Sequence, residues 1–253
     1  MASLWQREMV RFLRQRSRVI GALGTPLVFW LLVGSGFGSS FRPATGAPEQ
    51  GYLEYFFPGT VLMVLLFTSI FSNISVIEER REGFLLSVLV APASRLSLVL
   101  GKILGVTTLA SLQGGLLLLL SPLLGIRIAW TQWPLLLAVV VLIAVALSSL
   151  GFALAWKLDS IQGFHALMNL LLVPMWLLSG ALFPMSGASS WVRIVMLANP
   201  MTYAMSALRQ VLYLGEGQAA PDVCSLATAV CVTLLFGVGT LIVSVALVSR
   251  RSL

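Results

Sequence analysis

The most distinctive chemical feature of the sequence is a run of five consecutive charges, Glu78, Glu79, Arg80, Arg81 and Glu82. The run lies between two long apolar stretches. Because charges are costly in hydrocarbon, we expect it at a membrane surface. Charges of both signs at such a position suit ion pairs and hydrogen bonds with a partner, which guide docking more than they add affinity.

The residues after the charges predict a short helix on the membrane surface. Acidic residues are favourable at a helix N-terminus, so we expect this helix to begin at the charges. It continues through the apolar sequence FLLSVLVAP and ends at Pro92, since the residue before a proline disfavours helix. Gly83 weakens the helix and predicts an elbow. A solvated loop is the alternative interpretation.

Side chains that catalyse reactions or bind metals are scarce in this sequence. The single histidine, His165, has no other ligand at metal-binding spacing, and Cys224 and Cys231 are too far apart along one helix to form a disulfide. The closest sequence to a phosphate-binding loop, at Gly101 and Lys102, lacks both the upstream glycine and the following hydroxyl residue. We therefore expect no catalytic residue, no metal site and no cofactor in this chain.

Composition places the chain in a membrane. Of its 253 residues, 58% are hydrophobic and 10% are charged, whereas soluble domains are about 25% charged. Lipid offers backbone groups no hydrogen-bond partner, so the membrane-crossing parts must be helical, and we predict an all-α membrane protein with a single domain. No soluble basic region exists to bind nucleic acid, despite the net charge of +7.

Six stretches are apolar and long enough to cross a bilayer, which takes about 20 residues. They are 19–37, 57–77, 98–124, 134–156, 164–183 and 223–248. The segment 188–214 is less apolar, and we expect short helices there that dip into the membrane surface or lie on it. Most Lys and Arg residues fall on one side of this arrangement, which makes both termini cytoplasmic. The exceptions are Arg42, Arg127, Arg193 and Arg209.

Residues 1–18 predict an amphipathic helix in the plane of the membrane. Apolar residues, among them Trp5 and Phe12, recur at near-helical spacing. Arg7, Arg11 and Arg14 fall on another stripe, which we expect to face lipid headgroups. A plain positively charged anchor is the alternative.

Polar residues within the spans are few and mild. Ser69, Ser72 and Asn73 lie on one face of the second span, and Asn169 lies in the fifth. The polar face could line a substrate path or form a hydrogen-bonded seam between helices, and the sequence leaves both open. The near absence of charges within the spans disfavours an ion-driven carrier or channel. The energy source is therefore expected on another polypeptide.

Two motifs resemble the permease subunits of ABC-type exporters, in the branch that includes daunorubicin-resistance and Nod-factor export permeases. The first extends from the second span to the third, and the second follows the fifth span. The residues of the first are Pro58, Gly59, Glu79, Arg80, Gly83, Leu89, Pro92, Gly101 and Lys102. The residues of the second are Ser179, Gly180, Phe183, Pro184, Asn199, Pro200, Thr202, Tyr203, Leu208 and Arg209. Together the motifs extend the resemblance over essentially the whole chain.

This resemblance implies a half-transporter. Such permeases dimerise with themselves or a close relative, and they dock two separate ATPase subunits that carry the ATP and magnesium. The resemblance makes residues 78–95 a coupling helix that contacts the ATPase through the charged run, Gly83 and Pro92, with the N-terminal helix as a second contact. It places residues 188–214 at the outer side, with Asn199, Pro200, Tyr203 and Arg209 near the exit.

The function expected from the sequence is ATP-driven export of a hydrophobic or amphiphilic substrate across the inner membrane of a bacterium or archaeon. The apolar spans suit a drug, a lipid, a polyketide or a lipid-linked glycan. A permease-like scaffold that couples an ATPase to signalling or envelope assembly, without transport, is the alternative.

Overall fold

The computed structural model describes residues 2–14, 16–37, 51–83, 94–214 and 223–250. Within these ranges every regular element is helical, which confirms the expected all-α class. The α-helices are α1 (Ala2–Arg14), α2 (Arg16–Phe37), α3 (Tyr52–Phe71), α4 (Ile74–Arg81), α6 (Arg95–Leu118), α7 (Trp133–Lys157), α8 (Ile161–Trp176), α9 (Ser190–Ala198), α10 (Pro200–Leu212) and α11 (Leu226–Arg250). A π-helical turn, Leu177–Ala181, and two 3-10 turns, Ser121–Leu124 and Met185–Gly187, complete the regular structure of these ranges.

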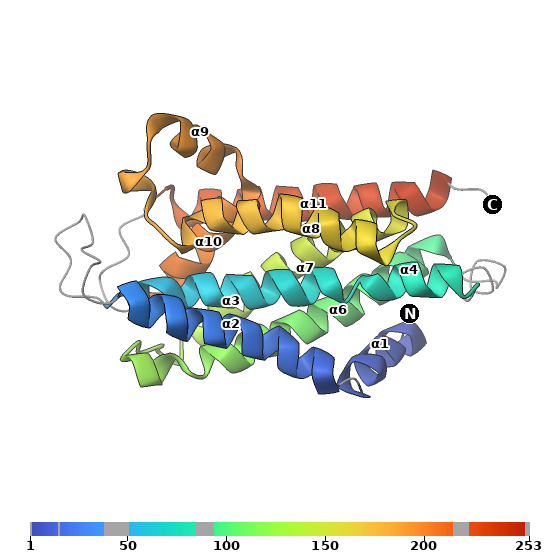
Figure 1. The fold of residues 1–253 in the computed structure, drawn as a ribbon, viewed down its shortest axis with the longest axis horizontal. Helices are drawn as coiled ribbons and strands as arrows, with labels where there is room; N and C mark the ends of the chain where they lie inside the picture. The colour runs from blue at the N-terminus through green and yellow to red at the C-terminus, as the bar shows by residue number, and fades with distance from the viewer. Residues whose placement is uncertain (1, 15, 38–50, 84–93, 215–222, 251–253) are drawn as a thin grey trace.

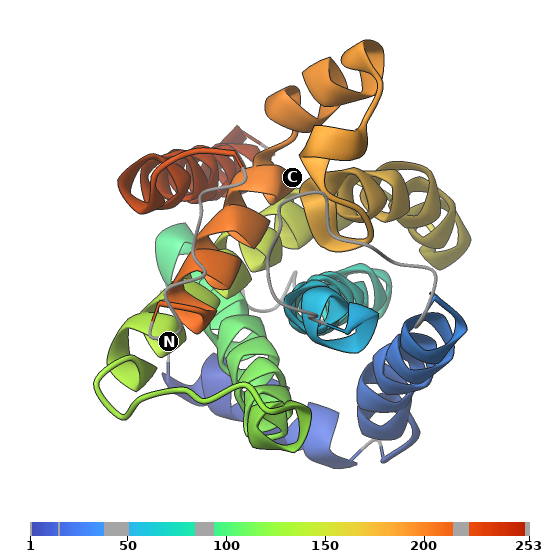
Figure 2. The same cartoon turned by 90° about the vertical axis from the view of Figure 1, so that its left-hand side faces the viewer.

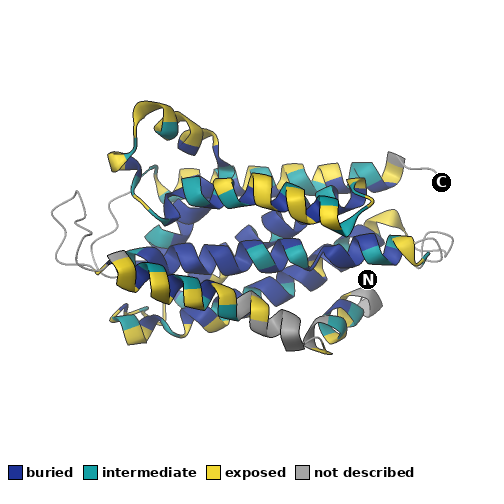
Figure 3. Ribbon diagram, viewed as in Figure 1, coloured by how far each residue is buried: buried dark blue, intermediate teal, exposed yellow. Residues whose placement is uncertain are grey.

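Helix α3 forms the centre of the bundle. It packs against α2, α6, α7 and α8, and it is buried along most of its length (Figures 2 and 3). Helix α11 packs on α7 and α10 and leaves large apolar side chains exposed, among them Leu234, Leu235 and Ile242. A soluble protein rarely exposes such a surface, whereas a bilayer covers it.

Within the described ranges, five helical stretches are long and apolar enough to cross a membrane. They are Tyr52–Arg81, Arg95–Leu124, Trp133–Lys157, Ile161–Ala181 and Leu226–Ser249. They coincide with the second to sixth predicted spans. Helix α2 covers the first predicted span, but its apolar described part is the shorter Gly24–Gly36. The count of six spans therefore stays a prediction.

The start of α1 and the end of α11 lie at the same end of the bundle, as an even number of passes requires (Figure 1). Helices α9 and α10 lie toward the opposite end, where residues 188–214 were expected to form short helices. We call the end with α1 and α4 the α4 end and the other the α9 end.

The structure differs from the expected position of the charged run. These residues end a helix instead of beginning one: α4 continues α3 after a short break at Ser72 and Asn73, and it ends at Arg81. Gly83 then adopts a φ of 75°, a left-handed conformation that favours glycine. The physical reason is that Arg80 and Arg81 stabilise the negative end of the helix dipole, which equally suits a C-terminus. The rest of the predicted coupling helix, with Pro92, falls on residues 84–93, outside the described ranges.

Candidate functional site

A buried cluster of charged side chains joins three helices at the α4 end. Glu79 of α4 is fully buried, and Lys102 of α6 and Glu8 of α1 are almost fully buried. The Lys102 ammonium nitrogen lies 2.6 Å from Oε2 of Glu79 and also pairs with Oε1 of Glu8. The hydroxyl of Ser75 donates to the other oxygen of Glu8 at 3.3 Å. One cation between two carboxylates therefore links α1, α4 and α6.

Two arginines of α1 complete the cluster toward the surface. Arg11 lies 3.2 Å from Oε1 of Glu79 and 2.5 Å from Oε2 of Glu78. Arg7 lies 3.3 Å from the same oxygen of Glu79. Glu79 thus faces three cations, which compensates its burial, since an isolated buried carboxylate would be very unfavourable. We name Glu8, Glu78, Glu79, Lys102, Arg7 and Arg11 the charge cluster.

A close helix crossing brings these groups together. A Cβ at Gly105 of α6 would lie 2.8 Å from Cβ of Glu8, so only glycine lets α1 approach α6 this closely. Trp5 of α1 donates to the hydroxyl of Thr108 on α6 at 3.0 Å. Thus α1 turns part of its polar stripe, including Arg7 and Arg11, toward the protein, although we expected that stripe to face headgroups. Phe12 and Arg14 lie in the last turns of α1.

Arg80 and Arg81 link α4 to the connection between α7 and α8. Arg80 donates to the carbonyl oxygens of Trp156 and Leu158, and its Nη2 lies 2.6 Å from Oδ1 of Asp159. Arg81 donates to the backbone oxygen of Asp159 at 3.0 Å. The last turn of α4 is therefore fixed to α1 and α6 on one side and to the end of α7 on the other.

These positions change the expected roles within the charged run. We expected Glu79 to contact a partner from an exposed tip. In this structure its carboxylate is buried at the centre of the charge cluster and is inaccessible to a partner. Glu78 and Arg80 are half-buried and bound within the chain. Arg81 and Glu82 are exposed at the tip. Within the described residues no group of His, Cys, Asp and Glu could hold a metal ion, and the cluster's carboxylates face cations of the chain.

The predicted polar face of the second span lies inside the bundle. Ser69, Ser72 and Asn73 are buried, and the Asn73 amide donates to the carbonyl oxygens of Ser69, at 2.6 Å, and of Ser148 on α7, at 3.3 Å. These contacts fit a packing seam between α3 and α7 within one chain. Asn169 lies apart from them, exposed on α8.

A break in the fifth span organises the α9 end. The π turn Leu177–Ala181 contains Gly180 at a φ of 85°, which interrupts the helix and frees carbonyl oxygens. Side chains of the second motif donate hydrogen bonds to these oxygens. Asn199 donates to the oxygen of Met175 at 2.6 Å, Thr202 to Leu178 at 3.2 Å, and Arg209 to Gly180 at 3.0 Å. In hydrocarbon such carbonyls need donors from the protein.

Neighbouring tyrosines extend this network. Tyr55 of α3 donates to the Gly180 oxygen at 3.2 Å, and the Arg209 guanidinium lies 4.4 Å from the centre of the Tyr55 ring. Asn199 also caps α10 by accepting from the amide of Met201, with Pro200 at the first helical position. Tyr203 donates to the Leu197 oxygen at 2.9 Å. Asn199, Thr202 and Arg209 therefore hold the broken helix in place, while Tyr203 links α10 to α9.

Replacing Asn199 with alanine is expected to lower the free energy of unfolding by about 1 kcal/mol, because α10 loses its N-cap. The loss also leaves the Met175 oxygen without the amide donor. Asn199→Ser keeps an N-cap acceptor and should recover most of the stability. Unfolding by SDS in mixed micelles measures both variants. Equal stability of Asn199→Ala and the unmodified protein would show that the cap contributes nothing.

Comparison with known proteins agrees with the two motifs and the helical bundle. Residues 1–213 match the family described as ABC-2 type transporter. The chain belongs to this family. As an ABC-2 protein, it is a membrane subunit of an ABC transporter and a permease, not a catalytic enzyme.

Relatives of this ABC-2 chain include other permeases. It is 28% identical over 216 residues to the putative transport permease ycf38 of Cyanophora paradoxa, over 81% of this chain and 71% of that protein. It is 26% identical to Nodulation protein J of Rhizobium leguminosarum bv. trifolii, over 99% of this chain and 93% of that one. With the inner membrane transport permease YhhJ of Escherichia coli (strain K12) it shares 27% identity over 61% of this chain, but only 41% of that protein.

Proposed function

We propose that this ABC-2 chain is the membrane half of an ATP-driven exporter. It pairs with a second copy or a close relative, and the pair works with two separate ATPase subunits that bind ATP and magnesium. The observation that carries the proposal is the charge cluster, because it ties the exposed tip of α4 to α1 and α6. A force applied to that tip would therefore displace α1, α4 and α6 as one unit.

The α4 end is the proposed side of ATPase contact. Arg81 and Glu82 are exposed there and serve as direct contacts, while Glu79 and Arg80 fix the tip from within. Both ends of the described chain lie on this side, which we place in the cytoplasm below the inner membrane. The positive-inside distribution of Lys and Arg supports the same orientation.

The proposed substrate is hydrophobic or amphiphilic. A hollow of only about 10 Å³ lies between α3 and α8 with an apolar wall, lined by Phe67, Phe71, Met168 and Asn169, among others. The support for the substrate class is the apolar composition of the spans, which suits a lipid, a drug, a polyketide or a lipid-linked glycan better than an ion. Among the predicted path residues, Asn169 is the one at this hollow, whereas Ser69, Ser72 and Asn73 lie within the packing seam.

Purification of the tagged protein from its native membrane in mild detergent tests the proposal, with mass spectrometry of the proteins that accompany it. We expect a soluble subunit with a phosphate-binding loop in equal amount to the permease. In a second preparation, Arg81→Glu with Glu82→Arg should reduce the recovered ATPase severalfold, since charges at a contact rim govern docking. Recovery of the permease alone, or with membrane partners only, would contradict the proposal and favour the non-transporting scaffold.

A further inference from the structure

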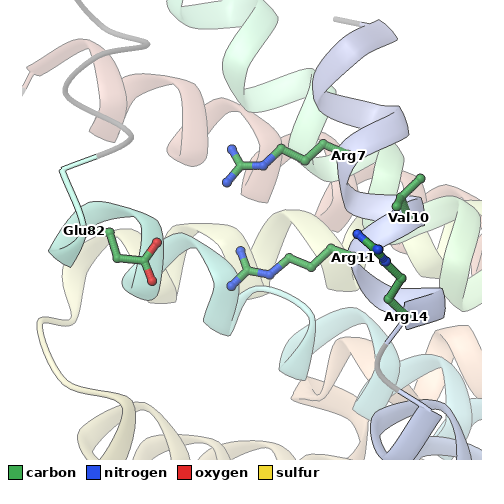
Figure 4. A pocket seen from close by; sticks show the side chains of 5 residues that line it. All are labelled: Arg7, Val10, Arg11, Arg14 and Glu82. Carbon is green, nitrogen blue, oxygen red and sulfur yellow. The ribbon is translucent and has the colours of Figure 1, made fainter.

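A cavity of about 360 Å³ opens beside the charge cluster, between α1 and the last turn of α4. Arg7, Val10, Arg11, Arg14 and Glu82 line it. Figure 4 shows the guanidinium groups of Arg7 and Arg11 extending from α1 toward α4, with Glu82 facing them. Positions 7, 11 and 14 share one face of the helix, so the cavity has a basic wall on one side and a single carboxylate opposite.

The charged groups that line this cavity are three guanidinium groups and one carboxylate, and this excess of cations favours an anion. Glu78 and Glu79 pair with Arg11, and Glu79 pairs with Arg7, but neither carboxylate lines the cavity. Arg14 is exposed and forms no ion pair with any part of the chain that the structure describes. Guanidinium groups bind phosphate oxygens in a bidentate manner, so a phosphate group suits this wall in charge and in the kind of hydrogen bond that it accepts.

We propose that the cavity binds the phosphate of an anionic membrane lipid whose headgroup also donates a hydrogen bond, such as phosphatidylglycerol. Arg14 and its neighbours hold the phosphate, and Glu82 accepts from the headgroup hydroxyl. Val10, which is 47% exposed, offers apolar surface to the glycerol and the upper acyl chain. Free phosphate would leave both Val10 and Glu82 without a favourable contact.

The position of the cavity supports a lipid as the occupant. It lies at the α4 end, where the apolar helices give way to charged residues, and α1 leads directly into α2. Trp5 is also partly exposed on α1, and aromatic side chains are common at the height of the headgroups. A lipid bound here would join α1 to α4 in addition to the charge cluster. This inference does not depend on transport.

Binding of three probes to the purified full chain in detergent tests the site: dioctanoyl-phosphatidylglycerol, dioctanoyl-phosphatidylcholine and inorganic phosphate. We expect measurable affinity for the first probe and at least tenfold weaker binding of the other two. Arg14→Gln should raise the Kd for the first by about tenfold, because it removes a charge-assisted hydrogen bond to the phosphate. Glu82→Ala should raise it less, since the lost headgroup hydrogen bond is partly offset by the lost repulsion.

Arg193→Gln is the matched control, because Arg193 is an exposed arginine on α9 at the opposite end and its loss should leave the Kd unchanged. Equal affinity for inorganic phosphate would overturn the lipid assignment in favour of a free anion. Equal affinity for phosphatidylcholine, or an unchanged Kd for Arg14→Gln, would overturn the site itself. None of these measurements requires an ATPase, so they stand apart from the proposed export function.

Discussion

Replacing Lys102 with methionine is expected to lower the free energy of unfolding by about 3–5 kcal/mol, because it leaves buried carboxylates without their shared cation. Lys102 pairs with both Glu8 and Glu79, and all three side chains are almost inaccessible to solvent. Methionine fills a similar volume, so the loss reports on charge more than on packing. SDS titration in mixed micelles, followed by tryptophan fluorescence, measures the change.

Two companion variants make this result specific. Lys157→Met removes an exposed lysine at the end of α7 and should change stability by less than about 0.5 kcal/mol. Adding Glu8→Gln to Lys102→Met should restore part of the lost stability, because Glu79 keeps Arg7 and Arg11. If Lys102→Met unfolds like Lys157→Met, the cluster does not hold these helices together.

Replacing Gly59 with valine is expected to cost about 1–3 kcal/mol through overpacking. A Cβ at this position would lie 2.8 Å from Cβ of Ala181 and 3.1 Å from its backbone oxygen, so α3 and the π turn would have to separate. The indole of Trp176 donates to the Gly59 oxygen at 2.9 Å, and separation would strain this bond as well. Thermal unfolding measured by tryptophan fluorescence detects the change.

Gly239→Ala is the control for this variant. A Cβ added at Gly239 of α11 would meet no atom within 4 Å, so alanine should fit and favour the helix by a few tenths of a kcal/mol to about 1 kcal/mol. Opposite signs for the two glycines are expected. A harmless Gly59→Val would mean that α3 and the fifth span do not approach closely.

The sequence predicted the long helices well because their apolar runs exceed what a soluble helix needs. The fourth span was predicted at 134–156 and α7 is Trp133–Lys157; the sixth was predicted at 223–248 and α11 is Leu226–Arg250. Their ends were clear from flanking polar residues. The start of α3 at Tyr52 was missed, because Glu54 interrupts the apolar pattern there.

The charge cluster could not be read from the sequence in the same way. Glu8 is the one acidic residue among the arginines of the N-terminal helix. This single acidic residue was the available sign that the helix contacts a cation from elsewhere in the chain. Its partner Lys102 was recognised as part of a motif without a role. Pairing these residues requires the crossing of α1 and α6 at Gly105, and helical periodicity does not specify which helices cross.

The second motif was recognised before its physical role was known. Ser179 and Gly180 were recognised as motif residues at the end of the fifth span, but the break in the helix and the need of its freed carbonyls for donors emerge only from the π turn. Asn199, Thr202 and Arg209 supply those donors across a gap of more than 20 residues in the sequence. Tyr55 had no distinguishing pattern, because its role depends on α3 lying beside this turn.

The measurement that tests the export function most directly is ATP-dependent accumulation in everted membrane vesicles. The vesicles carry the permease and its copurifying ATPase, they are incubated with a lipid extract of the same cells, and their contents are compared by mass spectrometry with and without ATP. We predict that at least one hydrophobic or amphiphilic compound accumulates only with ATP, and that Lys102→Met abolishes the accumulation. Identical contents with and without ATP would contradict an exporter.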